Sequence, residues 1–436
     1  MRPPRVALKV HFITLGCPKN EVDSDRMAAR VAASSYVLEP RLHAADVAVV
    51  NTCAFIQAAT EESVETVLEL AAEWKAARPG RSLVVAGCLA SRYGADLARE
   101  MPEVDAFVPV ADEDGLLDLL ERLSGQPPEA SEGGPPRTAG GASAYLQVAD
   151  GCFRRCTYCT IPFIRGGYRS RPLDDLLREA RLLVASGAKE IVLVGQDVSS
   201  YGRDLGDGSP SLAEAVRALA RTEGLEWLRL MYVQPDGITP ELLEVMAEEP
   251  AACRYLDLPL QHASRAVLHR MGRAGSGDEF LRLLGVVRSW MPDIALRTSL
   301  IAGFPGETDT DVEVLEDFLL LARFDYAGVF EYSREEGTRA AELPNQVPDD
   351  LKRQRWQRLR DAADSVGFEK AAEHVGETLE VLALGAEDGE TYGRSRGQAP
   401  DVDGVVYLDE DVSEGRIVRA RIVDAAAYDL VGEVRR

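Results

Sequence analysis

The stretch "DGCFRRCTYCTIPFIRGGYRSRP" (residues 150–172) contains Cys152, Cys156 and Cys159 with the spacing C-x₃-C-x₂-C. A loop this short can turn three thiolates toward one centre. Closed zinc and iron–sulfur sites use four protein ligands, so three cysteines leave one coordination position for an exogenous ligand. An open position is typical of a catalytic metal centre, and the motif therefore predicts one.

The chain beyond this motif alternates between strand and helix signals. The motif follows the first of six strand-like runs, which are residues 145–149, 190–195, 227–233, 255–260, 295–303 and 326–333. Amphipathic segments such as "PLDDLLREARLLVASG" separate the runs. This alternation predicts an α/β fold, a partial (β/α)₆ barrel that is shorter than the usual eight units. Active sites of such barrels lie at the carboxyl ends of the strands, where the motif begins.

A structural zinc site is the alternative interpretation of the motif. It needs a distant fourth ligand, for which His262 and Cys253 are candidates. The position of the motif on the functional rim of the barrel favours the catalytic interpretation.

Three further cysteines each end a strand-like run: "HFITLGC" ends at Cys17, "VAVVNTC" at Cys53 and "LVVAGC" at Cys88. The carboxyl ends of parallel strands meet at one edge of a sheet, so these cysteines are expected to converge. The alternative is three small buried residues, because free cysteine is among the most buried residue types.

The same N-terminal region predicts an open parallel α/β domain. Its strand-like runs are residues 7–15, 46–50 and 83–86, and its helical patterns are residues 20–33, 57–77 and 113–123.

The rest of the chain divides by composition. "GQPPEASEGGPPRTAGG" (125–141) is poor in bulky side chains and predicts a linker. Residues 371–436 show short β-like runs that predict a small all-β barrel, and they carry fifteen Asp and Glu against seven Arg and no Lys. The predicted domains are 1–125 (α/β), 126–142 (flexible linker), 143–370 (partial barrel with a connecting helix) and 371–436 (β-barrel).

The net charge of −23 argues against a nucleic-acid-binding protein, which would normally show a basic surface. It suits a basic protein partner, although on charge alone the favoured interpretation is an acidic balance that keeps a cytoplasmic enzyme soluble. No apolar run is long enough to span a membrane. Lys9 and His11 interrupt the N-terminal apolar stretch, which is too polar for a secretory signal. These features predict a cytoplasmic protein without a membrane partner.

The C-x₃-C-x₂-C motif, with Tyr158 before its last cysteine, resembles the radical S-adenosylmethionine (SAM) superfamily. The resemblance implies a [4Fe–4S] cluster held by Cys152, Cys156 and Cys159. Its open iron would bind the amino acid end of SAM, and one electron would cleave this cofactor to a 5′-deoxyadenosyl radical.

The combination of three N-terminal cysteines, a radical barrel and a small terminal β-barrel resembles the methylthiotransferases along the whole chain. The resemblance implies that Cys17, Cys53 and Cys88 hold a second [4Fe–4S] cluster, which carries the sulfur to be transferred. It also implies that the terminal barrel is a TRAM-like module for substrate recognition.

Four segments resemble the protein-modifying branch of this family, the RimO type: "TLGCPKN", "DLPLQHAS" (257–264), "IAGFPGET" (301–308) and "YSREEGT" (332–338). This branch implies an aspartate β-carbon of small-subunit ribosomal protein twelve as the substrate, free or in the ribosome. The alternatives are methylthiolation of a tRNA adenosine (isopentenyladenosine or threonylcarbamoyladenosine) and a non-catalytic metal-binding protein of the translation apparatus.

The resemblance also suggests cofactor-binding and catalytic candidates. Gly195 and Gln196, with Asp197, end the second barrel strand where relatives contact the cofactor, although an ordinary turn explains Asp197 equally well. Gly303 lies in the segment near the adenosine, with Tyr158 as a further cofactor contact. Thr308-x-x-Asp311 instead predicts a helix capping box. Gln261 and His262 are the catalytic candidates, although a lone histidine is as often a packing residue.

Five arginines in the motif have no acidic neighbour between Cys152 and Pro172: Arg154, Arg155, Arg165, Arg169 and Arg171. They are candidates for balancing cluster charge or binding a carboxylate, against the alternative of solvated or ion-paired surface residues. The expected partners are an electron donor such as flavodoxin or ferredoxin and a sulfur donor, and the expected state is a monomer.

Overall fold

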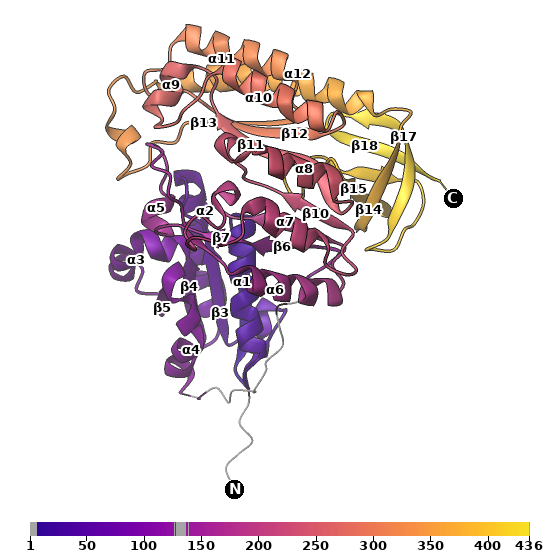
Figure 1. Ribbon diagram of the computed structural model, residues 1–436. Coiled ribbons are helices and arrows are strands. Elements are labelled where there is room, and N and C mark those ends of the chain that lie inside the picture. Colours follow the sequence, from indigo (N-terminus) through magenta and orange to yellow (C-terminus); the bar gives the residue numbers. More distant parts are fainter. Residues whose placement is uncertain (1–6, 126, 128–136, 138, 436) are drawn as a thin grey trace. The chain divides into compact units, whose positions relative to one another are not determined.

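The structure, a computed structural model, divides the chain into two compact units (Figure 1). It describes residues 7–125, 127, 137 and 139–435. The first unit contains the described residues before Ala139 together with Asp150–Phe153 and Cys159–Tyr168, and the remaining described residues form the second unit. The motif of residues 150–172 therefore contributes Cys152 and Cys159 to the first unit and Cys156 to the second.

The first unit is built on a five-stranded parallel sheet with the order β2-β1-β3-β4-β5. The strands are β1 (Lys9–Thr14), β2 (Val37–Leu38), β3 (Val47–Thr52), β4 (Ser82–Gly87) and β5 (Ala106–Pro109). The helices are α1 (Pro18–Ala32), α2 (Gln57–Glu69), α3 (Cys88–Glu100), α4 (Leu116–Ser124) and the short α5 (Ile161–Ile164). The predicted open parallel α/β domain is thereby confirmed.

Strand β3 shows why its sequence is almost uniformly apolar. Val50 packs on one face of the sheet in a cluster with Val67 of α2 and Leu89 of α3. Val49 packs on the other face with Met27 of α1 and Leu116 of α4. A parallel strand that is buried on both faces reads as a continuous hydrophobic run.

Helix α3 and strand β5 have no counterpart in the predicted pattern. Gly94 weakens the helical signal of α3, and β5 has four residues. Helix α2 ends at Glu69 and continues as a π-helical turn, Leu70–Lys75, within the predicted range of 57–77. Most of the predicted linker, residues 126–142, lies outside the described residues, and the predicted domain boundaries stay a prediction.

The second unit contains the predicted partial barrel, a six-stranded parallel sheet that follows the chain order. Its strands are β6 (Ser143–Gln147), β9 (Glu190–Val194), β10 (Trp227–Leu230), β11 (Ala252–Gln261), β12 (Ala295–Ala302) and β13 (Tyr326–Glu331). Its helices are α6 (Leu173–Ala185), α7 (Leu212–Ala220), α8 (Pro240–Glu248), α9 (Arg265–Arg270), α10 (Gly277–Trp290), α11 (Asp309–Ala322) and the connecting helix α12 (Asp349–Glu373). The short strands β7 (Ala149–Asp150) and β8 (Arg169–Ser170) flank the cysteine motif in the sequence.

The C-terminal part of this unit is the predicted small barrel, which is closed in the order β14-β15-β16-β18-β17. The strands are β14 (Thr378–Glu387), β15 (Glu390–Ser395), β16 (Val406–Leu408), β17 (Ile417–Ala426) and β18 (Asp429–Arg435). Val381, Val406 and Ile422 are fully buried in its core.

A buried ionic group joins the two barrels. Glu190, the first residue of β9, is paired with Arg229 of β10 at 2.8 Å and with Arg394 of β15. Burial alone would raise the pKa of Glu190, but the two arginines lower it to about 2. At this position the contact between the two barrels contains a carboxylate between two cations.

Candidate active site

Cys17, Cys53 and Cys88 lie at the carboxyl ends of three neighbouring strands in the first unit. Cys17 caps α1 after β1, Cys53 follows β3, and Cys88 begins α3 after β4. Because β1, β3 and β4 are adjacent in the sheet, these cysteines occupy one edge. The predicted arrangement at this edge is confirmed, whereas the role of the cysteines as ligands stays a prediction.

The three thiols lie close enough to influence one another. The Sγ atoms of Cys17 and Cys88 lie 3.9 Å and 3.7 Å from the same atom, Asn20 Oδ1. Burial raises the pKa of the Cys53 and Cys88 thiols, and the pKa of Cys88 reaches about 12 despite the nearby Arg165. Such thiols are protonated at neutral pH, so a metal that binds them must displace protons.

The three cysteines are chemically suited to an iron–sulfur cluster, which accepts thiolate ligands. In the described part of the chain, no three Cys, His, Asp or Glu side chains are grouped closely enough to hold one ion. A [4Fe–4S] cluster accepts soft thiolate ligands, each on a different iron, so its ligands are spread more widely. The three thiols at this sheet edge could each bind one iron of such a cluster, which would leave the fourth iron without a cysteine ligand.

Asn20 and Gly16 shape the loop that presents Cys17. The buried Asn20 side chain donates hydrogen bonds to Leu15 O at 2.8 Å and to Thr52 O at 2.9 Å, which links the ends of β1 and β3. Gly16 has a φ of +100°, and a Cβ atom there would lie 2.7 Å from Cys53 Cβ. The sequence contains both residues in "TLGCPKN", but nothing in their spacing identifies this role.

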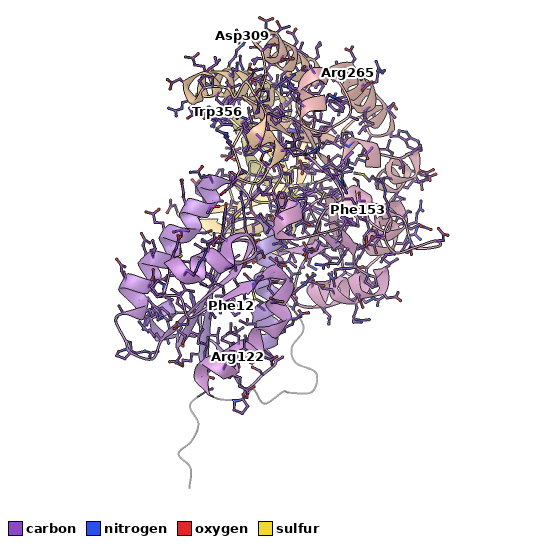
Figure 2. All side chains as sticks on the ribbon, turned by 90° about the vertical axis from the view of Figure 1, so that its left-hand side faces the viewer. Phe12, Arg122, Phe153, Arg265, Asp309 and Trp356 are labelled. Carbon is purple, nitrogen blue, oxygen red and sulfur yellow. The ribbon has the colours of Figure 1, made fainter. Side chains whose placement is uncertain are left out.

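The motif loop is anchored differently at its two ends. In the first unit, the Cys152 amide donates to Gly166 O at 3.3 Å, and Phe153 stacks on Tyr168 with ring centroids 5.2 Å apart. Phe153, which is labelled in Figure 2, is 55% exposed despite this contact. Phe153 therefore presents an exposed aromatic ring at the position that follows Cys152 in the chain.

Cys156 has a cationic neighbour in the second unit. Arg273 Nη1 lies 3.7 Å from Cys156 Sγ, and Arg273 Nη2 donates to Gln234 Oε1 at 2.6 Å and to Pro259 O at 2.8 Å. The guanidinium is thereby held in place beside the thiol. Arg273 lies far from the motif in the sequence, which explains why no sequence signal identifies it.

The predicted cofactor residues of the second unit lie at the carboxyl ends of their strands. Gly195 and Gln196 follow β9, and both amide atoms of the Gln196 side chain are buried without a hydrogen-bond partner in the described chain. An unpaired buried amide offers one donor group and one acceptor to a polar ligand. The Tyr158 ring lies edge-on to Phe304, with centroids 6.4 Å apart.

Gly303 follows β12 in a conformation that only glycine adopts without strain. Its φ is +75°, its amide donates to the Glu307 carboxylate at 3.0 Å, and a Cβ atom there would collide with Lys352. The predicted capping box is confirmed nearby, since the side chains of Thr308 and Asp311 satisfy each other's backbone amides at the start of α11.

The two catalytic candidates differ in their surroundings. His262 is fully buried, and its Nδ1 accepts from the amides of Ala263 at 3.0 Å and Ser264 at 2.9 Å. These contacts favour the packing interpretation of His262, and its Nε2 atom lies 3.3 Å from the buried Glu307 carboxylate. Gln261 is partly exposed and has a φ of +72°, a strained backbone of the kind that clusters at functional sites.

Two further motif arginines form ion pairs, and Cys253 is a buried core residue. Arg154 pairs with Asp197 and Asp236 at 2.7 Å each, and Arg171 pairs with Glu179 at 2.6 Å. Cys253 is fully buried near the amino end of β11, whereas His262 follows the carboxyl end of that strand. Cys253 and His262 therefore lie at opposite ends of β11.

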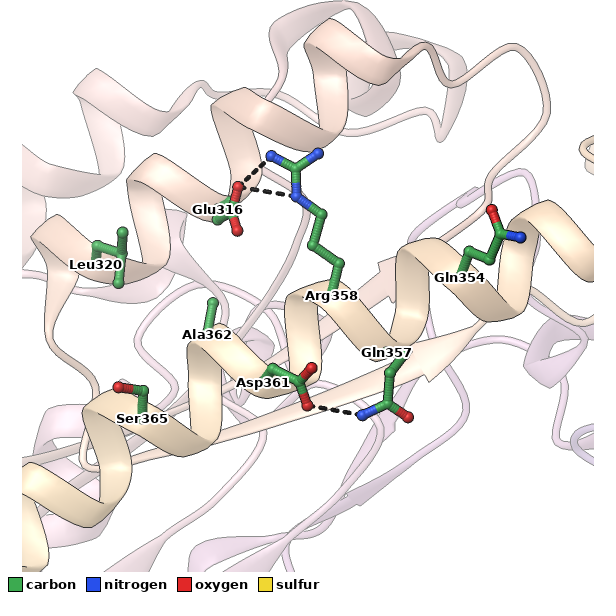
Figure 3. A pocket seen from close by; sticks show the side chains of 8 residues that line it. All are labelled: Glu316, Leu320, Gln354, Gln357, Arg358, Asp361, Ala362 and Ser365. Atoms are coloured by element: carbon green, nitrogen blue, oxygen red, sulfur yellow. Dashed lines mark hydrogen bonds and ion pairs between the residues drawn. The ribbon is translucent and has the colours of Figure 1, made fainter.

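A hollow of about 630 Å³ between α11 and α12 contains none of the predicted site residues. Figure 3 shows that Arg358 and Glu316 bridge the two helices beside it. The lining residues are Glu316, Leu320, Gln354, Gln357, Arg358, Asp361, Ala362 and Ser365.

Among the described helices, none combines the length and the apolar character that a membrane crossing requires.

Three family models match successive parts of the chain. Residues 9–109 match the model described as "Uncharacterized protein family UPF0004", residues 146–319 match the radical SAM superfamily, and residues 375–434 match the TRAM domain. These matches agree with the three predicted kinds of domain.

Solved structures share the fold. The radical S-adenosylmethionine methyltransferase TsrM from Kitasatospora setae, solved with cobalamin and a [4Fe–4S] cluster bound, has a TM-score of 0.56 at 16% identity. The superposition covers 88% of this chain and 82% of that chain.

Curated relatives resemble the chain along its whole length. The ribosomal protein uS12 methylthiotransferase RimO of Geobacter sulfurreducens is 45% identical over 441 residues, which cover 98% of each chain. The protein of the same name from Moorella thermoacetica is 46% identical, over 98% of this chain and all of the relative. The chain therefore belongs to the RimO family of radical SAM methylthiotransferases.

Proposed function

We propose that this enzyme attaches a methylthio group to the β-carbon of an aspartate in ribosomal protein uS12. The supporting observation is the name shared by the relatives that are 41–46% identical over 98% of the chain. That similarity includes the C-terminal barrel, which the family resemblance links to substrate recognition. An aspartate β-carbon carries no acidic proton, so acid–base chemistry alone is a poor route to it.

We further propose that Cys152, Cys156 and Cys159 hold the [4Fe–4S] cluster that binds SAM, and that Cys17, Cys53 and Cys88 hold a second one. When bound, the first cluster and SAM supply one-electron chemistry that can remove a hydrogen atom from an unactivated carbon. The chain contributes the thiolates, the cation of Arg273 beside Cys156, and the unpaired amide of Gln196 as a partner for the amino acid end of SAM. Tyr158 and Gly303 complete the proposed cofactor contacts, and Gln261 is the candidate beside the substrate.

The charge of the C-terminal barrel favours a basic protein over tRNA. Residues 371–436 carry fifteen acidic and seven basic side chains, and a surface of this sign repels phosphates. A ribosomal protein that binds RNA is basic and would be attracted to the same surface. A cytoplasmic monomer that takes electrons from flavodoxin or ferredoxin, and sulfur from a separate donor, is part of this proposal.

Mass spectrometry of a strain that lacks this gene tests the substrate. We expect uS12 to lose the mass of one methylthio group while the digested tRNA nucleosides stay unchanged. Loss of a methylthioadenosine with intact uS12 would instead assign the enzyme to the tRNA-modifying branch. A strain complemented with the Cys156→Ala variant provides the control, because this variant should fail to restore the modification.

A further inference from the structure

Arg165 lies among the groups that surround the three N-terminal cysteines. Its side chain is 1% exposed, and its Nη2 atom lies 3.7 Å from Cys88 Sγ. The same atom donates to Asp23 Oδ2 at 2.7 Å and to Asn20 Oδ1 at 2.9 Å. Asn20 Oδ1 also lies within 3.9 Å of the Cys17 and Cys88 thiols, so Arg165 belongs to the group of side chains around these cysteines.

The guanidinium is fixed in direction as well as in place. Its Nη1 atom donates to Asp150 Oδ1 at 3.2 Å, while Nη2 donates to Asp23. Each of the two terminal nitrogens of the guanidinium is therefore bound to a carboxylate. A buried cation is costly to desolvate, and it persists only where anionic partners offset that cost. Arg165 therefore presents a fixed positive charge and an N–H group to Cys88 from within the protein.

We propose that Arg165 is a positioning residue that raises the reduction potential of the cluster held by Cys17, Cys53 and Cys88. Hydrogen bonds to cluster sulfurs and the local net charge set the potentials of iron–sulfur centres. A cation beside Cys88 stabilises the reduced, more negative cluster, and Asp23 moderates this effect. The inference rests on the proposed function, because it requires those three cysteines to hold a cluster.

The test uses the full chain with Cys152, Cys156 and Cys159 replaced by Ala, which leaves the N-terminal cysteines as the cluster site. The reconstituted protein is titrated with reductant while electron paramagnetic resonance follows the reduced cluster. We expect Arg165→Gln to lower the equilibrium constant for reduction at least tenfold, which is about 59 mV for one electron. Asp23→Asn should shift the potential in the opposite direction, because it removes a negative charge.

Two matched variants separate charge from structure. Arg165→Lys keeps the charge and should shift the potential less than Arg165→Gln. Arg137→Gln removes another buried arginine of the same unit, which pairs with Asp25 at 2.9 Å, and should leave the potential unchanged.

The outcomes distinguish this inference from the proposed function. If the parent protein without the motif cysteines binds no iron, the proposed second cluster is wrong. If iron is present and the potential stays the same in Arg165→Gln and Asp23→Asn, the role of Arg165 is wrong. If Arg165→Gln binds no iron, the Asp23→Asn variant provides the test. A more positive reduction potential in Asp23→Asn supports the electrostatic role of Arg165, and an unchanged potential refutes it.

Discussion

Tyr255 of β11 donates a hydrogen bond of 2.7 Å to Asp403, which lies between strands β15 and β16 of the C-terminal barrel. Arg297 of β12 approaches the other oxygen of Asp403 to 3.4 Å. Tyr255 and Arg297 are buried, and the side chain of Asp403 is shielded from solvent. The two barrels of the second unit are thus joined by polar groups that are shielded from water.

This arrangement predicts a pH-dependent stability. Burial raises the pKa of Asp403 to about 6, although Arg297 lowers it. Because the folded protein holds this proton more tightly than the unfolded chain, the contribution to stability is present at low pH and is lost as the pH rises through about 6. Between pH 7 and pH 5, we expect the unfolding free energy of the wild type to rise by about 1 kcal/mol relative to Asp403→Asn. Urea unfolding of both proteins at pH 7 and at pH 5 measures this change. If the difference in unfolding free energy between wild type and Asp403→Asn is the same at both pH values, the raised pKa of Asp403 is wrong.

The Gly16→Ala variant should lose iron at the N-terminal site. The new Cβ atom would press on Cys53, and a positive φ costs alanine about 1 kcal/mol as well. Gly80→Ala is the matched control, because Gly80 has a φ of +87° but no neighbour within 4 Å of the added atom. Both variants should lose stability in thermal unfolding, whereas iron analysis should distinguish them. Full iron content in Gly16→Ala would show that the close approach to Cys53 is dispensable.

Two cysteine variants should separate the two proposed clusters. Cys156→Ala should abolish formation of 5′-deoxyadenosine and keep the iron bound near Cys53. Cys53→Ala should keep cofactor cleavage and lose methylthio transfer to uS12. Liquid chromatography of the nucleoside and mass spectrometry of uS12 report the two activities. A methylthiolated product from Cys53→Ala would refute the role of the N-terminal cysteines.

Arg273→Gln should slow cofactor cleavage at least tenfold, since it leaves the Cys156 thiolate without its neighbouring cation. Arg254→Gln serves as the control, because Arg254 forms an exposed pair with Asp293 at 2.6 Å. The rate of 5′-deoxyadenosine formation under excess reductant is the readout. Equal rates in the two variants would show that Arg273 only packs against the motif.

The strands and the cysteine edge could be predicted from the sequence for the same physical reason. Parallel strands are buried on both faces, so they stand out as apolar runs, and their carboxyl ends share an edge. Cys17, Cys53 and Cys88 could therefore be grouped although they are distant in the chain. The six strands of the partial barrel were recognisable on the same basis.

The groups around the cysteines could not be predicted in this way. Arg165 meets Asn20 across 145 residues of sequence, and Arg273 meets Cys156 across 117. No local pattern encodes such pairings, because each depends on how separate strands and loops pack. His262 shows a different limitation of the sequence. The segment around it is compatible with a catalytic residue and with a buried packing residue, so the sequence alone could not distinguish the two.

The buried pairing of Glu190 with Arg229 and Arg394 has a consequence for how this architecture can diverge. The C-terminal barrel cannot be replaced by an arbitrary domain without affecting the radical barrel. A chain that ended after α12 would lack Arg394, and Glu190 would then be paired with Arg229 alone. Exchange of the barrel between family branches requires the incoming module to supply an equivalent of Arg394. Substitutions on barrel surfaces away from Glu190 leave this ionic group intact, whereas a change of Arg394 affects both barrels.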